Sequence, residues 1–260
     1  MASEKTDALV LRTIEFSETS LVVVLLTRQF GKSSALAKGA RRAKGPFEGA
    51  LDLLSICRVV IIPKSGDTLD LLTEAKLQRR FRAGERNLGR LYAGYYVAEL
   101  LREMTDRGDP HPDLYDLALE TLEELDGETD VRACLLRFEL QTLRLLGHAP
   151  TIDRCAACGS EVPEGGRFGF GVTSGGVLCA ACRPATRQVV LLRGATRETL
   201  RSLLSEAAVS GPPPPVPAEL HGELRGVINR YITNLLGGPP RMQSYLAAAS
   251  PTIDGQGRRR

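Results

Sequence analysis

The sequence has no long hydrophobic run. The longest aliphatic run near its start, LVVVLL at 21–26, is far shorter than the roughly 20 residues that a membrane-spanning helix needs. The opening MASEKTDALV mixes charged residues and contains no apolar signal core. These absences predict a cytoplasmic protein that does not contact a membrane.

The motifs that would indicate catalysis are also missing. A phosphate-binding loop needs Gly-x4-Gly-Lys, but counting from Gly39 puts Lys44 where the second glycine should stand. The stretch GFGVTS fails the dinucleotide-binding pattern at Ser174, and no Gly-x-Ser-x-Gly occurs. The three histidines lie far apart, and the acidic residues at 120–130 are typical of a solvated helix face. The chain is therefore expected not to be an enzyme.

Charge is distributed unevenly along the chain, although the formal net charge is only +3. Residues 1–90 carry a net charge of +6, residues 91–150 carry −8, and residues 151–260 carry +5. A basic first segment followed by an acidic one favours a polyanionic partner that is held by one end of the molecule.

The first 80 residues have the pattern of short β-strands. The five runs are ALVLRTIEF (8–16), LVVVLLT (21–27), SSALAKG (33–39), LLSICRVVIIP (53–63) and LDLLTEAKLQ (69–78). Turn-forming stretches such as RQFGK and KSGD separate some of these runs. Five short strands without an intervening helix suit a small closed barrel, because closure removes the exposed strand edges.

From residue 85 the periodicity becomes helical. One face of the stretch 85–104 collects, at three- and four-residue spacing, Leu88, Leu91, Tyr92, Tyr95, Ala98 and Leu101. A second helix is expected to begin with Asp109 as its N-cap and Pro110 at its first position. A third helix is expected to end at Gly147, and helices resume at 196–207 and 218–238.

Two Cys-x2-Cys pairs, CAACG and CAACR, are separated by twenty residues. Four thiolates at this spacing can surround one Zn²⁺ tetrahedrally, so we expect one ion bound by Cys155, Cys158, Cys179 and Cys182. The alternative, a redox dithiol, needs a single Cys-x-x-Cys at the start of a helix in a βαβ unit, and no such unit is expected. Four sulfur ligands close the coordination shell, which indicates a structural ion. The intervening RFGFGVTSGGVL predicts a small hairpin of the zinc-ribbon or knuckle type.

A concentrated basic stretch, LAKGARRAKG, follows the third expected strand. The chain resembles the bacterial RecO family of recombination mediators over nearly its whole length. The resemblance rests on two stretches, the opening ALVLRTIEFSETSLVVVLLTRQFGKSSALAKGARRAKG and the motif CAACG…CAAC after LLRFELQTLRLLGHAP. The resemblance implies an N-terminal oligonucleotide-binding (OB) fold and a helical C-terminal domain. It also implies binding of single- and double-stranded DNA, annealing of complementary strands and, with RecR, loading of RecA onto DNA coated by single-strand-binding protein.

The expected fold class is therefore α+β, with a five-stranded OB-fold β-barrel followed by an α-helical domain that carries a four-cysteine zinc knuckle or ribbon. The OB-fold nucleic-acid-binding domain is expected at 1–80 and the first part of the helical domain at 81–150. The zinc-binding module is expected at 151–186, the second helical part at 187–250 and a disordered tail at 251–260.

The basic stretch supplies the candidate DNA contacts, because DNA binding is governed by cations that neutralise phosphates. These candidates are Lys38, Arg41, Arg42 and Lys44. The alternative is an ordinary solvated loop. Aromatic residues are scarce in this region, which leaves Phe47 as the candidate platform for base stacking and predicts binding that is mainly electrostatic.

A second basic group contains Arg79, Arg80 and Arg82. These side chains either extend the DNA path or form ion pairs with the acidic helical domain, and the sequence favours neither. At the level of function, the alternative to a DNA-binding mediator is a zinc-stabilised adaptor for protein assembly whose DNA contact is incidental. A metallo-hydrolase would need an open zinc site, which four cysteines do not leave.

Overall fold

The computed structural model describes residues 3–42, 45–47, 49–66, 68–85 and 87–248, and the structural statements below concern these residues. The chain divides into two compact units, Met1–Gly127 with Ser244–Arg260 and Glu128–Gln243. The finer domain boundaries expected from the sequence stay a prediction, and the expected tail at 251–260 lies outside the described residues. Within the described part of the chain, no helix is both long and apolar enough to cross a membrane.

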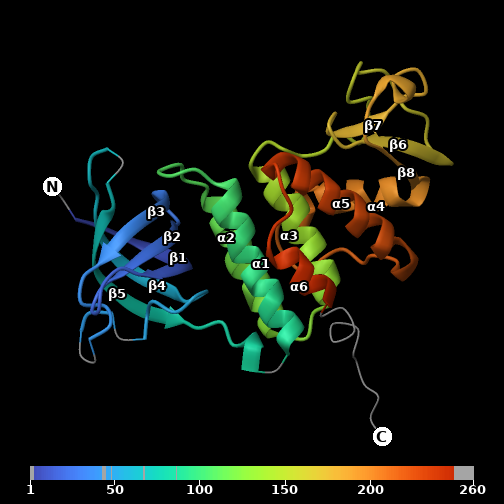
Figure 1. The fold of residues 1–260 in the computed structure, drawn as a ribbon. Coiled ribbons are helices and arrows are strands. Elements are labelled where there is room, and N and C mark those ends of the chain that lie inside the picture. Colours follow the sequence, from blue (N-terminus) through green and yellow to red (C-terminus); the bar gives the residue numbers. More distant parts are fainter. Residues whose placement is uncertain (1–2, 43–44, 48, 67, 86, 249–260) are drawn as a thin grey trace, which may run out of the picture. The chain divides into compact units, whose positions relative to one another are not determined.

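The first unit begins with a closed five-stranded barrel, which confirms the fold expected from the strand pattern (Figure 1). The strands are β1 (Glu4–Glu15), β2 (Leu21–Thr27), β3 (Gly31–Ala37), β4 (Ile56–Ile62) and β5 (Asp70–Arg79). Around the barrel they follow the order β1-β2-β3-β5-β4, with β4 antiparallel to β1 and β3 parallel to β5. A register shift between Val10 and Arg12 interrupts β1 along β2, as bulges do at barrel corners. The arrangement is OB-like.

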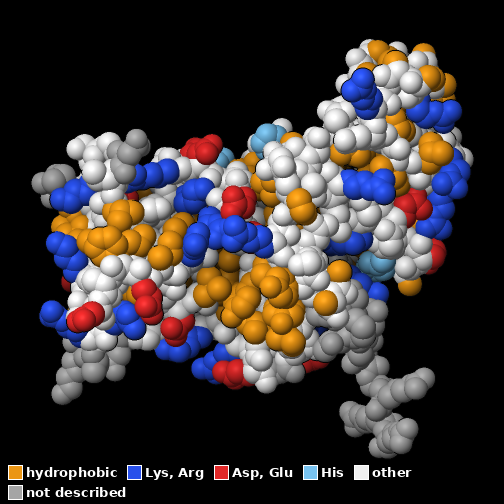
Figure 2. Space-filling view, in the orientation of Figure 1, with side chains coloured by type: hydrophobic (Ala, Val, Ile, Leu, Met, Phe, Trp, Pro, Cys, Tyr) orange, Lys and Arg blue, Asp and Glu red, His pale blue; other side chains and the backbone are white. Residues whose placement is uncertain are grey.

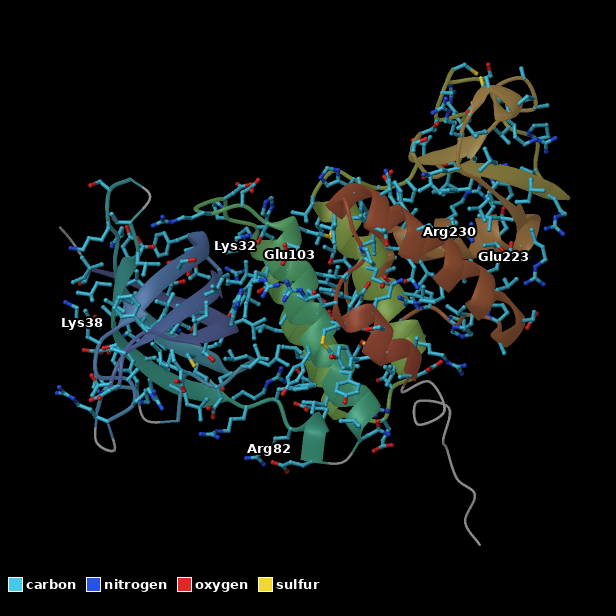
Figure 3. The ribbon with its side chains drawn as sticks, viewed as in Figure 1. Lys32, Lys38, Arg82, Glu103, Glu223 and Arg230 are labelled. Carbon is cyan, nitrogen blue, oxygen red and sulfur yellow. The ribbon has the colours of Figure 1, made fainter. Side chains whose placement is uncertain are left out.

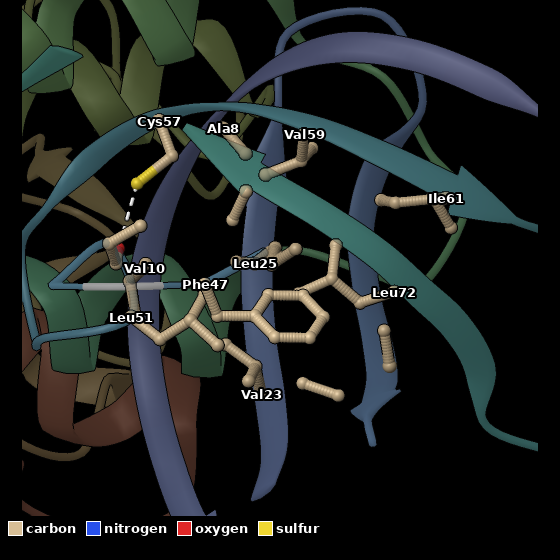
Figure 4. Packing of buried hydrophobic residues seen from close by; sticks show 14 residues of the cluster. Ala8, Val10, Val23, Leu25, Phe47, Leu51, Cys57, Val59, Ile61 and Leu72 are labelled. Carbon is tan, nitrogen blue, oxygen red and sulfur yellow. Dashed lines mark hydrogen bonds between the residues drawn. The ribbon is translucent and has the colours of Figure 1, made fainter. Parts of the chain in front are cut away.

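The barrel core contains one residue for which we expected a different role. The buried cluster includes Val10, Val23, Leu25 and Leu72 (Figure 4). Phe47, from the connection between β3 and β4, is only 4% exposed and belongs to the same cluster. The expectation that Phe47 is an exposed stacking platform is therefore wrong. The connection turns back over the barrel, where Ala75 N–H donates to the carbonyl of Pro46 at 3.0 Å, and the aromatic ring fills the apolar interior.

Helix α1 (Leu88–Met104) follows the barrel after a 3₁₀ turn at Ala83–Glu85. Its buried surface is broader than the predicted stripe. Leu88 is 52% exposed, whereas Tyr96, Val97 and Leu100, which the stripe leaves out, are buried. The stripe is wrong in these positions because α1 contacts the barrel strands β1 and β2 as well as helix α2 (Pro112–Asp126).

Helix α2 begins two residues later than predicted. His111 is the N-cap and Pro112 the first helical residue, whereas Asp109 and Pro110 were expected in these roles. The segment DPHP places a proline directly after a possible N-cap residue twice, and the helix begins at the second proline because of packing against the barrel. A Cβ atom placed on Gly31 of β3 would lie 2.2 Å from the carbonyl oxygen of Asp109, so the backbone before the helix lies directly against the barrel.

The connection between α1 and α2 is bonded to the barrel at β3. The Nζ of Lys32 donates to the carbonyl of Arg102 at 2.6 Å and also to the carbonyl of Thr105, at the end of α1. Arg107 forms an ion pair with Asp70 of β5 at 3.1 Å. Burial lowers the pKa of Lys32, and the two carbonyls compensate its lost hydration. These contacts make the barrel and the two helices one unit.

The second unit combines helices with a three-stranded sheet (Figure 1). Its elements are α3 (Val131–Leu145), β6 (Arg167–Gly171), β7 (Gly176–Leu178), β8 (Val189–Arg193), α4 (Gly194–Leu204) and α5 (His221–Leu236), with 3₁₀ turns at Arg183–Ala185, Glu206–Ala208 and Ala218–Leu220. Helix α6 (Met242–Ala248) follows, and from Ser244 on it belongs to the first unit. The hairpin of β6 and β7 and the third helix are confirmed. Strand β8 was not predicted, because its short apolar run directly precedes a helical pattern and its partner β6 lies far back in the sequence.

Candidate nucleic-acid interface and metal centre

The basic stretch lies at one end of the barrel, against the turn that joins β1 to β2. Arg41 N–H donates to the carbonyl of Thr19 at 3.0 Å, and Gly39 N–H donates to the Oγ of Ser20 at 3.4 Å. The guanidinium of Arg41 also pairs with Glu15 at 3.3 Å. These bonds join residues 12–20 and 38–42 into one surface, which we call the loop face.

Three of the four expected cations of this stretch lie on the loop face. Lys38, Arg41 and Arg42 are all exposed, and Lys38 lies on the side of the barrel away from α1 and α2 (Figure 3). The stem of Arg42 passes over Gly39, with its Cδ 3.5 Å from where a Cβ of that glycine would be. Lys44 lies outside the described residues. That these side chains contact DNA stays a prediction.

The loop face also contains two residues that sequence reasoning missed. Phe16 is 62% exposed, and Ile14 is 40% exposed. Arg12 is exposed and makes no hydrogen bond or ion pair with any described residue. Arg12 and Ile14 are two residues apart on β1 and so share a face of the strand. Phe16 could have been recognised because it directly precedes the polar turn SETS, where an apolar ring gains little burial.

The second basic group is largely engaged within the first unit. Arg79 pairs with Glu123 of α2 at 3.3 Å, and Arg80 pairs with Asp52 at 3.1 Å. The side chain of Arg82 is exposed and points away from the fold (Figure 3), and it has no partner among the described residues. The expected ion pair with the helical domain thus occurs at Arg79, whereas Arg80 pairs within the barrel domain. A role of the group in DNA contact stays a prediction.

The four cysteines of the paired motif come together in the second unit, as expected. Their sulfur atoms all lie within 4.8 Å of one another, and the Sγ atoms of Cys158 and Cys179 are 3.8 Å apart. Sulfurs placed tetrahedrally at the Zn–S distance of about 2.3 Å would be separated by about 3.8 Å. The turn of the first pair is closed by the Gly159 N–H, which donates to the carbonyl of Cys155 at 2.8 Å. The donor set and its spacing therefore fit a metal ion.

Hydrogen bonds around this cluster favour the thiolate form of the first pair. Burial raises the pKa of Cys155, but backbone N–H groups of Cys179 and its other neighbours outweigh this effect and lower the pKa to about 6. Hydrogen bonding with Ser160 lowers the pKa of Cys158, whereas hydrogen bonds with the neighbouring thiols, Cys158 first, raise the pKa of Cys182 to about 12. Since metals bind the thiolate, the surroundings of the first pair are suited to an ion.

A buried arginine of α4 holds the first cysteine pair in place. Arg197 is 3% exposed. Its guanidinium donates hydrogen bonds of 2.8 to 3.1 Å to four carbonyl oxygens, those of Ile152, Asp153, Val162 and Pro163. Because two of these residues precede the cysteine pair and two follow it, one side chain fixes both ends of the first knuckle to α4.

Comparison with known proteins covers nearly the whole chain. The family model described as "Recombination protein O N terminal" matches residues 1–81, and the one described as "Recombination protein O C terminal" matches residues 85–244. DNA repair protein RecO of Rhodopirellula baltica is 47% identical over 262 residues, which cover 92% of this chain and 97% of that protein. Proteins of the same name from Anaeromyxobacter dehalogenans strain 2CP-C and Myxococcus xanthus are each 34% identical, over 96% and 93% of this chain and 98% and 96% of their own length.

Proposed function

The chain belongs to the RecO family of DNA repair proteins, and on that premise we propose that it is a recombination mediator that binds DNA through its loop face. It binds single- and double-stranded DNA and anneals complementary strands. With RecR it helps load RecA onto DNA coated by single-strand-binding protein. Action on chromosomal DNA places it in the cytoplasm, at the nucleoid.

The observation that carries the proposal is the composition of the loop face. Three exposed cations after β3, Lys38, Arg41 and Arg42, lie at one end of a closed barrel, and the exposed Arg12 lies farther along β1, opposite Val24 of β2. Phe16, with its exposed ring, belongs to the same β1–β2 turn that Arg41 contacts. Cations that follow a phosphate backbone, combined with an aromatic face for one base, are what non-specific binding of single strands requires.

Annealing needs no chemical step in this proposal. Two strands repel each other through their phosphates, and a basic surface lowers that repulsion by replacing their counterions. The chain is accordingly proposed to be no enzyme. We expect purified protein to anneal strands without nucleotide and to hydrolyse neither ATP nor DNA.

The metal proposed for the four-cysteine centre is a single zinc ion with a structural role. Cys155, Cys158, Cys179 and Cys182 would bind it, and four sulfur ligands leave no position for a substrate or water. The ion would supply folding free energy to a segment too short to bury a core of its own.

Arg41→Ala/Arg42→Ala tests the loop face directly. We expect weaker binding of every DNA sequence, because phosphate contacts carry no sequence information. Each lost contact should flatten the log–log salt dependence by about 0.7 on single strands and about 0.9 on duplex. Stability should stay within about 0.5 kcal/mol, because both side chains are exposed. Fluorescence titrations at several salt concentrations measure the first effect, and thermal melts the second.

The matched control is Lys5→Ala/Lys76→Ala, which removes the same charge from two exposed barrel positions outside the loop face. Annealing should fall in the first variant and persist in the control, with and without RecR and single-strand-binding protein. Equal affinity and equal salt slope in both variants would refute the loop face as the DNA site. The protein-assembly adaptor would then be the better hypothesis.

A further inference from the structure

An open groove lies between strand β8 and helix α5 in the second unit, with a volume of about 630 Å³. Its apolar lining includes Val172 and Val189. Its polar lining is four side-chain amides, one hydroxyl and one guanidinium, and these belong to Gln188, Asn229, Asn234, Gln243, Thr233 and Arg230. Among the described residues, no carboxylate lines it. The groove is therefore rich in neutral hydrogen-bonding groups and carries one positive charge.

Most of these polar groups have no partner in the described protein. Arg230 of α5, labelled in Figure 3, is exposed, and its side chain forms no ion pair or hydrogen bond with a described residue. The Oε1 atom of Gln243 is buried and accepts no hydrogen bond. Gln188 holds its backbone at φ 57°, which costs free energy for a residue with a side chain. A buried acceptor without a donor and a strained residue at the rim both indicate that the groove is shaped for a ligand.

Further unpaired arginines extend from the groove across the sheet. The aliphatic part of the Arg183 side chain lies over Gly169 of β6, beside the Val189 side chain of the groove. A Cβ atom placed on Gly169 would be 2.9 Å from Cδ of Arg183 and 3.0 Å from Cγ1 of Val189. Arg167 stands two residues before Gly169 and so on the same face of β6. Arg187 directly precedes the groove residues of β8. All three arginines are exposed and have no described partner.

Several other arginines of this unit are engaged within the protein. Arg193, Arg201 and Arg225 form ion pairs with carboxylates, and Arg197 binds four carbonyls. Figure 2 shows basic side chains at several points over the region of β6, β7 and β8. A sheet surface whose cations have no internal partner is available to a polyanion.

We infer that the β8–α5 groove and the arginines beside it bind a second single strand of nucleic acid, with one nucleotide seated in the groove. A strand offers one phosphate per nucleotide to the unpaired arginines, and its bases and sugars suit the neutral amides of the groove better than the carboxylates of an acidic peptide do. The amides can bond base edges and sugar oxygens, and the valines offer an apolar floor to a base.

This inference rests on the proposed function and deepens it. Annealing requires two strands on one protein. The loop face would hold one strand and the β8–α5 groove the other, each on a different compact unit of the chain. Pairing would then join strands that are bound at separate surfaces of the same molecule.

The experiment uses the full chain carrying Arg41→Ala/Arg42→Ala, so that the loop face contributes less. The probe is a fluorescent oligothymidine of 30 nucleotides, and the same oligonucleotide carrying 5-iodouracil serves for photocrosslinking. In this background Arg230→Gln should flatten the salt dependence by about 0.7, the value for one phosphate contact on a single strand. Arg132→Gln, which removes an equal charge from an arginine paired with Asp130, should leave the slope unchanged.

Asn234→Trp is the second variant, and it fills the groove without changing charge. It should remove crosslinks to residues 188–190 and 229–243 and slow annealing, while zinc content and circular dichroism stay as in the parent. The inference is overturned if crosslinks fall only on the barrel, or if both variants bind and anneal like their parent. It is equally overturned if a fluorescent acidic peptide binds the groove and oligothymidine does not compete. The proposed function is tested separately, by comparing DNA binding and annealing of the Arg41→Ala/Arg42→Ala parent with those of the wild type.

Discussion

Replacing Arg197 by methionine should detach the first cysteine knuckle from α4. Methionine keeps most of the apolar stem but offers no donor to the carbonyls of Ile152, Asp153, Val162 and Pro163. Lysine at this position has three donors on one atom and cannot reach both sides of the knuckle as a planar guanidinium does. We therefore expect Arg197→Lys to recover at most part of the loss.

The free-energy cost of Arg197→Met depends on which of the four carbonyls can form hydrogen bonds with water in the variant. Asp153 and Pro163 are exposed, so their carbonyls can be hydrated in the variant. Ile152 and Val162 are 5% and 8% exposed, and their carbonyls would lose a charged donor without replacement. Hydrogen bonds to charged groups contribute about 1.5 to 3 kcal/mol each, so the two buried acceptors set a cost of about 3 to 6 kcal/mol. The variant also avoids the desolvation penalty of burying a charge, which offsets part of this cost. We therefore expect a loss of stability at the lower end of the range, about 3 kcal/mol.

Urea unfolding followed by circular dichroism measures this cost, since the chain has no tryptophan to report it. Release of metal to a chromophoric chelator gives a second readout that a purely local packing defect would not change. We expect faster release from Arg197→Met than from the wild type. A loss of stability below about 1 kcal/mol together with an unchanged release rate would refute the reasoning, because two buried carbonyls cannot lose a charged donor at so small a cost.

Other outcomes follow from the same structure. Cys158→Ser should lower the zinc content of purified protein well below one ion per chain, and a wild type that is folded without metal would contradict the structural role. Phe16→Ala should weaken binding of single strands and leave thermal stability unchanged, whereas Phe47→Ala should cost about 3 to 5 kcal/mol because it empties the barrel core; equal behaviour of the two would be inconsistent with their exposures. Burial raises the pKa of Glu223, but hydrogen bonds from Arg193 outweigh burial and lower the pKa in the folded state. The stabilisation of the fold by the Glu223 carboxylate is therefore present above its ordinary pKa and is lost as the pH falls through the folded-state pKa. Glu223→Gln should therefore remove part of the acid-side decline in stability, and an unchanged pH profile would argue against this ion pair.

The barrel and the cysteine cluster could be predicted because their signals are local and repeated. Strand β2, for example, is the apolar run LVVVLLT that the sequence marks between turn-forming stretches, and the structure places a strand at Leu21–Thr27. The cysteines identify one another through their paired spacing, and the hairpin between them brings the pairs together. Such patterns need no knowledge of distant parts of the chain.

The failed predictions depended on contacts between distant residues. Phe47 looks like an exposed loop aromatic until the β3–β4 connection turns back over the barrel. Leu88 fits a one-sided helix, but α1 is covered from more than one direction and leaves that position at the surface. In each case the deciding neighbour is far away in sequence, so periodicity and composition could not identify it.

Lys32, which connects β3 to the end of α1, also limits where the chain can be cut into separately folding parts. The two family models separate between residues 81 and 85, whereas Lys32 of the barrel binds carbonyls at the end of α1 and Arg107, after α1, pairs with Asp70 of the barrel. A barrel cut at the border of the models would lose both carbonyls that bind the Lys32 ammonium group and would expose the barrel surface that α1 covers. Exchange of parts between relatives should therefore carry residues 1–127 as one piece, because the boundary that sequence similarity marks is not a boundary at which this fold can be separated.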